Sequence, residues 1–350
     1  MDWTEQVPRV PIDWLLEREN PSVRALALTE LLDRDANDAE AVEARQRIAG
    51  ARYTAQLLEG QYPDGHWGKP ERYFSKHTGT AWRWLMLHEL GFDPLHHKMR
   101  QAAKFLLDIA TNEEQGGFGS QPGHNPVPCY NGWLLWGLHR SGYGEDPRVQ
   151  RGLRWVVETM RYHDGDEQVP DPDNGCWGRH VCVRGVIPIL RALAELPTKV
   201  RSEGTNRVLH EGVEFMLKHR VYKRSHNLDK PMNVKLTQLT FPGFYWPDFV
   251  EVLLILTGLG CTDPRMEDAI AYLRNKQAKD GTWKLQRTYN ERSKHDTFPV
   301  VVPLEERGAP SKWVTLRALT VLKRWYSTPY REKPAFQGAG LHTRRGQGGV

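Results

Sequence analysis

Three of the four cysteines in this 350-residue chain, Cys129, Cys176 and Cys182, lie in segments that also contain histidines. Three thiolates and one imidazole form a Cys₃His set, a common ligand set for zinc. His180 and His226 are the candidates for the fourth ligand, but His180 is only two residues from Cys182 and is sterically awkward. The pattern therefore predicts zinc held by Cys129, Cys176, Cys182 and His226.

Two other interpretations of the cysteines stay open, because no C-x₂-C pair gives the strong zinc signal. Free cysteines are often small buried residues that pack helix ends. They can also act as acid, base or nucleophile without a metal. Whether the site is a zinc site or a metal-free one, the neighbouring polar residues Asp173, His180 and Tyr130 are candidates for proton transfer.

A repeated motif indicates which elements position these side chains. The pattern Q-x-x-x-G-x-W occurs at 61–67 ("QYPDGHW") and at 277–283 ("QAKDGTW"), with weaker copies at 112–118 ("NEEQGGF") and 161–167 ("RYHDGDE"). The first three copies in chain order are separated by 51 and 49 positions. A regular period of this length is typical of an array of like units within one domain.

Each unit is predicted to be a helical hairpin. An amphipathic segment leads into the motif, and a more apolar segment follows it, ending at Gly with Asp-Pro close behind. Gly closes a helix at its C′ position, and Asp-Pro begins the next with an N-cap and a Pro at N1. Five amphipathic outer helices alternate with six inner helices, and no strand pattern competes; we expect the inner helices near 21–33, 78–90, 131–142, 181–196, 247–259 and 312–325.

The fold class expected is all-α, an (α/α)6-like toroid formed by residues 1–330. In a closed ring, the N-termini of the inner helices point to one end of the cavity. The three cysteines, Tyr130, Asp173, His180 and His226 all precede or begin inner helices and would gather there, whereas Cys261 lies at the opposite end.

Aromatic residues on or beside the inner helices are candidates for contact with an apolar substrate, unless they are simply core. They are Trp82, Trp133, Trp246 and Trp313. Insertions at 220–246 and 284–311 are predicted to lie as lids near the same rim, and residues 331–350 to form a flexible tail.

The motif is similar to the repeat of squalene cyclases and protein prenyltransferase β-subunits, and "NEEQGGFGS" resembles the prenyltransferase version. The resemblance covers residues 40–326. It implies a toroid with a hydrophobic central cavity and an enzyme, a cyclase, transferase or lyase, that acts on a small hydrophobic, isoprenoid-like substrate.

The chain departs from both families at their reactive residues. Prenyltransferase β-subunits bind zinc through an Asp, a Cys and a His, but no Asp-x-Cys pair precedes a matching helix here. Squalene-type cyclases protonate their substrate with an Asp-x-Asp-Asp motif. The segment "PDPDN" supplies Asp171 and Asp173, with Asn174 at the last position.

Composition excludes several other classes of protein. The net charge of +5 is spread along the chain, which argues against a nucleic-acid partner. No apolar run approaches the ~20 residues of a membrane span, and the N-terminus lacks signal-peptide features, so we expect a cytoplasmic protein. The alternatives left open are a metal-free lyase or isomerase using the rim residues, a carbohydrate-active enzyme, and a non-catalytic interaction module.

Overall fold

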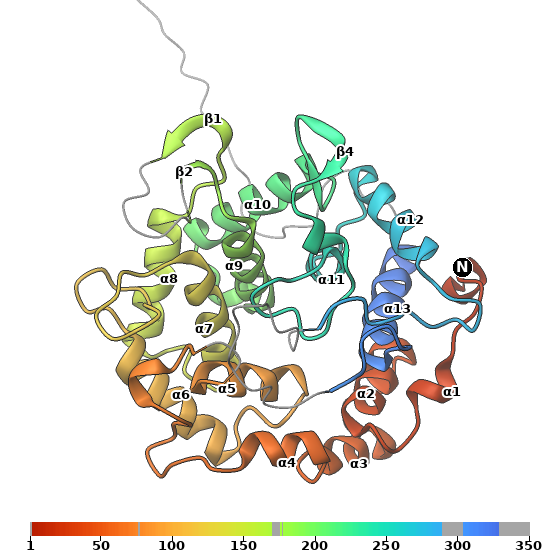
Figure 1. The fold of residues 1–350 in the computed structure, drawn as a ribbon, viewed down its shortest axis with the longest axis horizontal. Coiled ribbons are helices and arrows are strands. Elements are labelled where there is room, and N and C mark those ends of the chain that lie inside the picture. Colours follow the sequence, from red (N-terminus) through yellow and green to blue (C-terminus); the bar gives the residue numbers. More distant parts are fainter. Residues whose placement is uncertain (1, 76–77, 170–175, 177, 289–303, 329–350) are drawn as a thin grey trace, which may run out of the picture.

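The computed structural model describes residues 2–75, 78–169, 176, 178–288 and 304–328, and it is mostly helical (Figure 1). The α-helices are α1 (Ile12–Leu15), α2 (Pro21–Leu26), α3 (Ala39–Ile48), α4 (Arg52–Leu58), α5 (Thr80–Glu89), α6 (His97–Ala110), α7 (Pro128–Arg140), α8 (Pro147–Thr159), α9 (Val183–Glu195), α10 (Glu203–Lys218), α11 (Phe249–Gly258), α12 (Glu267–Asn275) and α13 (Lys312–Ser327). Shorter helical turns are η1 (Trp3–Gln6), η2 (Ala27–Leu31, a π-helix), η3 (Pro70–Arg72), η4 (Thr198–Val200), η5 (Val234–Thr237) and η6 (Pro264–Met266).

Helices occupy all six positions predicted for the inner layer, namely α2 with η2, α5, α7, α9, α11 and α13. Figure 1 shows these helices around a common centre, with α3, α4, α6, α8, α10 and α12 outside them. Burial follows the same division: α7 buries nearly every side chain from Pro128 to Leu138, whereas α6 buries one face. Contacts of α13 with α2 and η1 bring the two ends of the described chain together.

The predicted helix boundaries rest on the expected capping contacts. The side chain of Asp146 accepts a hydrogen bond from the backbone N–H of Arg148, with Pro147 at the first helical position of α8. At the end of α7, Gly142 has a φ of +82°, a left-handed conformation that closes the helix.

The two full motif copies are structural joints, as predicted. Gln61 donates through Nε2 to the carbonyls of Gly65 and Lys98, at 3.0 and 2.9 Å, and so ties its own turn to α6. Trp67 is buried and donates through Nε1 to the carbonyl of Glu59. Gln277 and Trp283 repeat these contacts, and here the neighbouring acceptor is the backbone of Arg9, near the start of the chain.

Two short antiparallel hairpins correct the prediction that the chain holds no strands. β1 (Asp164–Val169) pairs with β2 (Gly178–His180), and β3 (Lys223–Arg224) pairs with β4 (Asn227–Pro231). Strands this short and polar leave no alternation of apolar residues in the sequence. Both hairpins lie in connections between helices, so the helical layers are undisturbed.

The apolar half of the 220–246 insertion reaches the middle of the molecule. The ring of Phe241 stacks on Trp313 with a centroid separation of 4.1 Å, and Phe244 meets Trp82 at 5.1 Å. This segment therefore fills space between the inner helices. Only part of the other predicted lid, 284–311, lies within the described residues, and the predicted tail lies outside them.

In the described part of the chain, none of the helices combines the length and the apolar character needed to cross a membrane.

Candidate functional site

The structure brings the three predicted cysteines to one cavity of about 550 Å³, called here the thiol cavity. Cys129 and Tyr130 come from the first turn of α7, Cys182 caps α9, and Cys176 lies between β1 and β2. The other lining residues are Ser120, Gly123, His124, Asn125, Val127, Arg184 and Tyr245.

A weak copy of the repeat motif holds one wall of the thiol cavity. Asn112, at the motif's first position, donates through Nδ2 to the carbonyl of His124, 3.2 Å away. Asn131 on α7 accepts from the N–H of Phe118 and donates to its carbonyl. The loop between Phe118 and Val127 is thereby attached to the helix that carries Cys129.

Two of the three thiols contact each other. Cys129 and Cys176 are hydrogen-bonded through their side chains, and the N–H of Cys182 donates to the carbonyl of Cys176 at 3.1 Å. The hydrogen bond with Cys176 and burial together raise the pKa of the Cys129 thiol well above its ordinary value. Burial also raises the pKa of the Tyr130 phenol. Both groups are therefore neutral proton donors at neutral pH.

A cation stands beside these neutral donors. The Arg184 side chain hydrogen-bonds the thiol of Cys182, and its Cζ lies 4.7 Å from the ring centroids of both Tyr245 and Trp246. Stacking against two aromatic rings fixes the guanidinium at the cavity wall. The thiol cavity can thus hold an anionic or electron-rich group next to proton donors.

Other predicted site residues lie elsewhere. His180, on β2, is half-exposed and its Nδ1 lies 3.3 Å from Oδ1 of Asp164. His226 is exposed in the turn of the β3–β4 hairpin, and it is absent from the lining of the thiol cavity. Asp173 falls outside the described residues.

The described residues do not support the zinc prediction. Within the described ranges, no three His, Cys, Asp or Glu side chains are arranged to hold a metal ion. The Arg184 cation beside Cys182 would repel a dication, and His226 is not with the thiols. The present arrangement of the described residues therefore does not fit zinc.

The four predicted substrate-contact tryptophans divide between core and cavity. Trp82 and Trp133 are buried and pack edge to face at 4.9 Å, so they belong to an aromatic core with Phe244. Trp246 is half-buried beside Arg184, and Trp313, in the first turn of α13, lines a second cavity.

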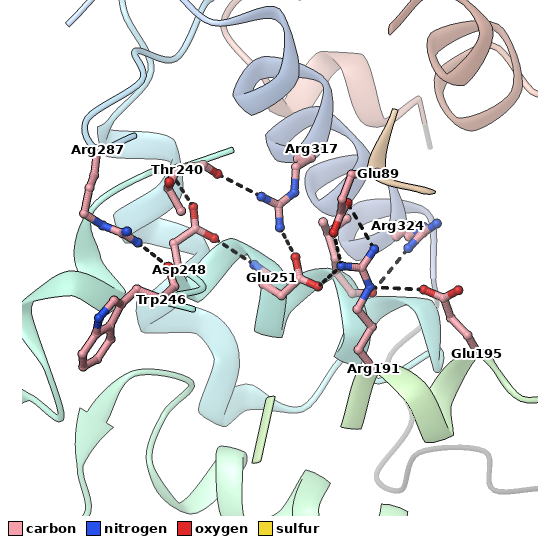
Figure 2. Close-up of polar contacts among 11 residues, drawn as sticks. Glu89, Arg191, Glu195, Thr240, Trp246, Asp248, Glu251, Arg287, Arg317 and Arg324 are labelled. Atoms are coloured by element: carbon pink, nitrogen blue, oxygen red, sulfur yellow. Dashed lines mark hydrogen bonds and ion pairs between the residues drawn. The ribbon is translucent and has the colours of Figure 1, made fainter. Parts of the chain in front are cut away.

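This second cavity, of about 450 Å³, is lined by charged residues of the inner helices and is called here the ion-pair cavity (Figure 2). Glu251 stands in the first turn of α11, whereas Glu89 and Glu195 are the last residues of α5 and α9. Arg191 contacts Glu89 at 2.5 Å, Glu251 at 3.2 Å and Glu195 at 3.5 Å, and Glu251 also pairs with Arg317. The resemblance implied a hydrophobic centre, but the structure shows a chain of buried ion pairs. Buried charges persist when each finds an opposite partner, as these do.

The protonation of the ion-pair cavity follows from burial and pairing. Burial alone would raise the pKa of Glu89, but the bidentate contact with Arg191 brings it below its ordinary value. Burial raises the pKa of Glu251 above its ordinary value. Arg191 and Arg317 offset this only in part, and the nearby Glu89 and Asp248 add to the rise. Burial holds the pKa of His88 well below its ordinary value, and Arg140 and Arg191 add to this effect.

Sequence reasoning missed Arg184 and the ion-pair residues Glu89, Arg191, Glu251 and Arg317. An arginine in the first turn of α9, where a cation opposes the helix dipole, is a signal that could have drawn attention to Arg184. The ion-pair residues come from four different helices, and their pairing is visible only in the folded chain.

No protein-family model matches the chain, and no curated protein matches it. Among solved structures, the ligand-free type II terpene cyclase MstE from Scytonema matches with a TM-score of 0.32 and 15% identity, over 81% of this chain and 99% of that chain. A variant of MstE in complex with geranylgeranyl dihydroxybenzoate, its substrate, matches with a TM-score of 0.33 and 15% identity, over 89% and 98% of the two chains. TM-scores of this size do not establish a common fold, and the ligand belongs to that protein.

Proposed function

We propose that the chain is an enzyme built on a toroid of six helical hairpins, and that the thiol cavity is its active site. The observation that carries the proposal is the meeting of Cys129, Cys176 and Cys182 with Tyr130 and Arg184 around one cavity. Four of these five residues stand at the starts of two neighbouring inner helices. The contact of α13 with α2 supports a closed ring.

The proposed reaction is proton transfer on a small hydrophobic, unsaturated substrate of isoprenoid type, as in a lyase or isomerase. Arg184 would hold an electron-rich group of the substrate, since its guanidinium is fixed by two aromatic rings. Tyr130 or Cys129, kept neutral by burial, would give a proton to one carbon of the substrate's double bond as the donor takes back a proton from the allylic carbon, so that the double bond moves and the donor is regenerated. The isoprenoid class comes from the resemblance of the repeat motif.

Clustered thiols also favour an enzyme over the non-catalytic interaction module. A module needs no thiols gathered at one cavity, whereas proton-transfer chemistry uses such groups directly. The carbohydrate-active alternative would place paired carboxylates at its reaction centre. The described lining of the thiol cavity includes no carboxylate.

The test uses farnesol, geranylgeraniol and their diphosphates as probes, with products identified by mass spectrometry. We expect turnover of at least one probe, and a loss of 100-fold or more in Tyr130→Phe and Cys129→Ser. Cys261→Ser is the matched control, because Cys261 is buried away from the thiol cavity and its variant should keep full activity. Turnover that is equal in all of these variants would reject the thiol cavity as the active site.

Zinc remains a prediction and has its own test. Elemental analysis of protein prepared without chelators should find less than stoichiometric metal if the reaction is metal-free. Stoichiometric zinc that is lost in Cys176→Ser would instead favour the zinc interpretation of the cysteines.

A further inference from the structure

We propose that Cys129 and Cys176 are a redox pair, which a peroxide converts to a disulfide joining Cys176 to the start of α7. The crosslink itself does not depend on the reaction proposed above. Its consequence for turnover, a loss of activity because Cys129 is then no longer a proton donor, does rest on that proposed function.

The geometry supports this pair above the other combinations of cysteines. The thiols of Cys129 and Cys176 are hydrogen-bonded to each other, so the crosslink would join atoms that are already neighbours. The thiol of Cys182 is instead hydrogen-bonded to Arg184. Cys261 lies beyond the end of α11 and does not line the thiol cavity.

The start of α9 contacts the surroundings of both cysteines. The N–H of Cys182 donates to the carbonyl of Cys176. Gly185 packs on Pro128, next to Cys129: a side-chain carbon at position 185 would lie 2.8 Å from the Pro128 ring. The start of α9 therefore lies against both Cys176 and the first turn of α7.

The oxidation balances with hydrogen peroxide as the oxidant. A thiolate attacks one peroxide oxygen, the O–O bond breaks, and the departing hydroxide takes up a proton to leave as water, giving a sulfenic acid. The second thiol attacks this sulfur, the S–O bond breaks, and a second water leaves. The two thiols lose two electrons and two protons, and the peroxide is reduced to two waters.

Both cysteines line the thiol cavity, which gives a small oxidant a route to either sulfur.

The experiment treats reduced full-length protein, freed of metal by a chelator, with hydrogen peroxide and then blocks remaining thiols with an alkylating agent. We expect the number of free thiols to fall from four to two, with one peptide pair linking Cys129 to Cys176 and reversal by dithiothreitol. Cys182→Ser and Cys261→Ser should still form the link, whereas Cys129→Ser and Cys176→Ser should not.

Four free thiols after treatment, oxidation without a crosslink, or a disulfide that includes Cys182 would each overturn the assignment. Circular dichroism of every variant excludes unfolding as the cause. Peptide mapping needs no activity, so a mapped link without turnover of any probe rejects the proposed function alone. Turnover without a link rejects only the redox pair.

Discussion

At the scale of single residues, the molecule depends on charges buried at its centre. Glu251 lies between Arg191 and Arg317, and all three side chains are largely buried (Figure 2). Removing one member of such a group leaves an uncompensated charge in a medium that solvates it poorly. The ion-pair cavity is thus a point at which small changes should have large effects.

We expect Glu251→Gln to lower the free energy of unfolding by about 3–5 kcal/mol, since two arginines lose their shared partner. The control is Glu113→Gln, which breaks the exposed pair with Arg151 and should cost less than about 1 kcal/mol. Urea denaturation of both variants measures the difference. Equal losses would contradict a central role for the buried pairs.

His88 should make stability depend on pH. Its pKa in the folded state lies well below the ordinary value, so the unfolded state binds more protons once the pH falls below about 6.5. Stability should therefore fall on acidification, and His88→Gln should reduce that fall.

The measurement is urea denaturation of wild type and variant between pH 8 and pH 5. The pKa values of His139 and His219 are also lowered, mainly by burial, so part of the dependence should survive in the variant. His226→Gln, at an exposed turn, is the control and should leave the dependence as in wild type. An unchanged slope in His88→Gln would show that its protonation is not linked to unfolding.

At the scale of elements, the motif acts as a joint between a turn and the next outer helix. Gly65 has a φ of +100°, and a side-chain carbon there would lie 2.3 Å from the carbonyl oxygen of Gln101 on α6. Both the backbone conformation and the close approach require glycine. The joint therefore sets the distance between successive outer helices.

Gly65→Ala should cost roughly 2–5 kcal/mol, from the left-handed backbone and the clash together. Gly60→Ala is a matched control, because Gly60 also has a positive φ, +69°, but has nothing within 4 Å of the added carbon. It should cost only about 1–2 kcal/mol. Thermal or urea unfolding that gives the two variants equal stability would contradict the close contact with α6.

At the scale of the whole molecule, hydrogen bonds and ion pairs join the N-terminal and C-terminal parts of the described chain. Gln277 donates to the carbonyl of Arg9 at 2.7 Å, and Lys312 pairs with Glu17 at 2.5 Å. Lys323 and Arg324 on α13 contact Glu30 in η2. The first and last helices thus depend on one another.

Deletion of residues 1–11 should lower the free energy of unfolding by roughly 2–4 kcal/mol, because it exposes the contacts of buried Val7 and removes one of the two acceptors of Gln277. Differential scanning calorimetry should show a lower Tm. Deletion of the predicted tail, residues 331–350, is the control and should leave the Tm unchanged. A Tm unaffected by loss of residues 1–11 would mean that contact between the chain ends adds nothing to stability.

The helical architecture could be predicted from the sequence because its signals are local. Gly and Asp-Pro at helix boundaries, apolar periodicity, and the repeated Gln, Gly and Trp act within a few residues or at a constant spacing. They predicted the positions of α5, α7, α9, α11 and α13 within a few residues, and they indicated that Cys129 and Cys182 stand at helix starts. The short β1–β2 and β3–β4 hairpins escaped prediction because their strands contain too few apolar residues to give a periodic pattern.

Only the tertiary structure decided which side chains meet. The hydrogen bond between Cys129 and Cys176, the position of Arg184 over Tyr245, and the separation of His226 from the thiols depend on how distant segments pack. The same holds for the charged centre, where Glu89, Arg191, Glu251 and Arg317 come from four helices. Local patterns determine helices through short-range sterics and capping, whereas a site is formed by packing between segments far apart in the chain.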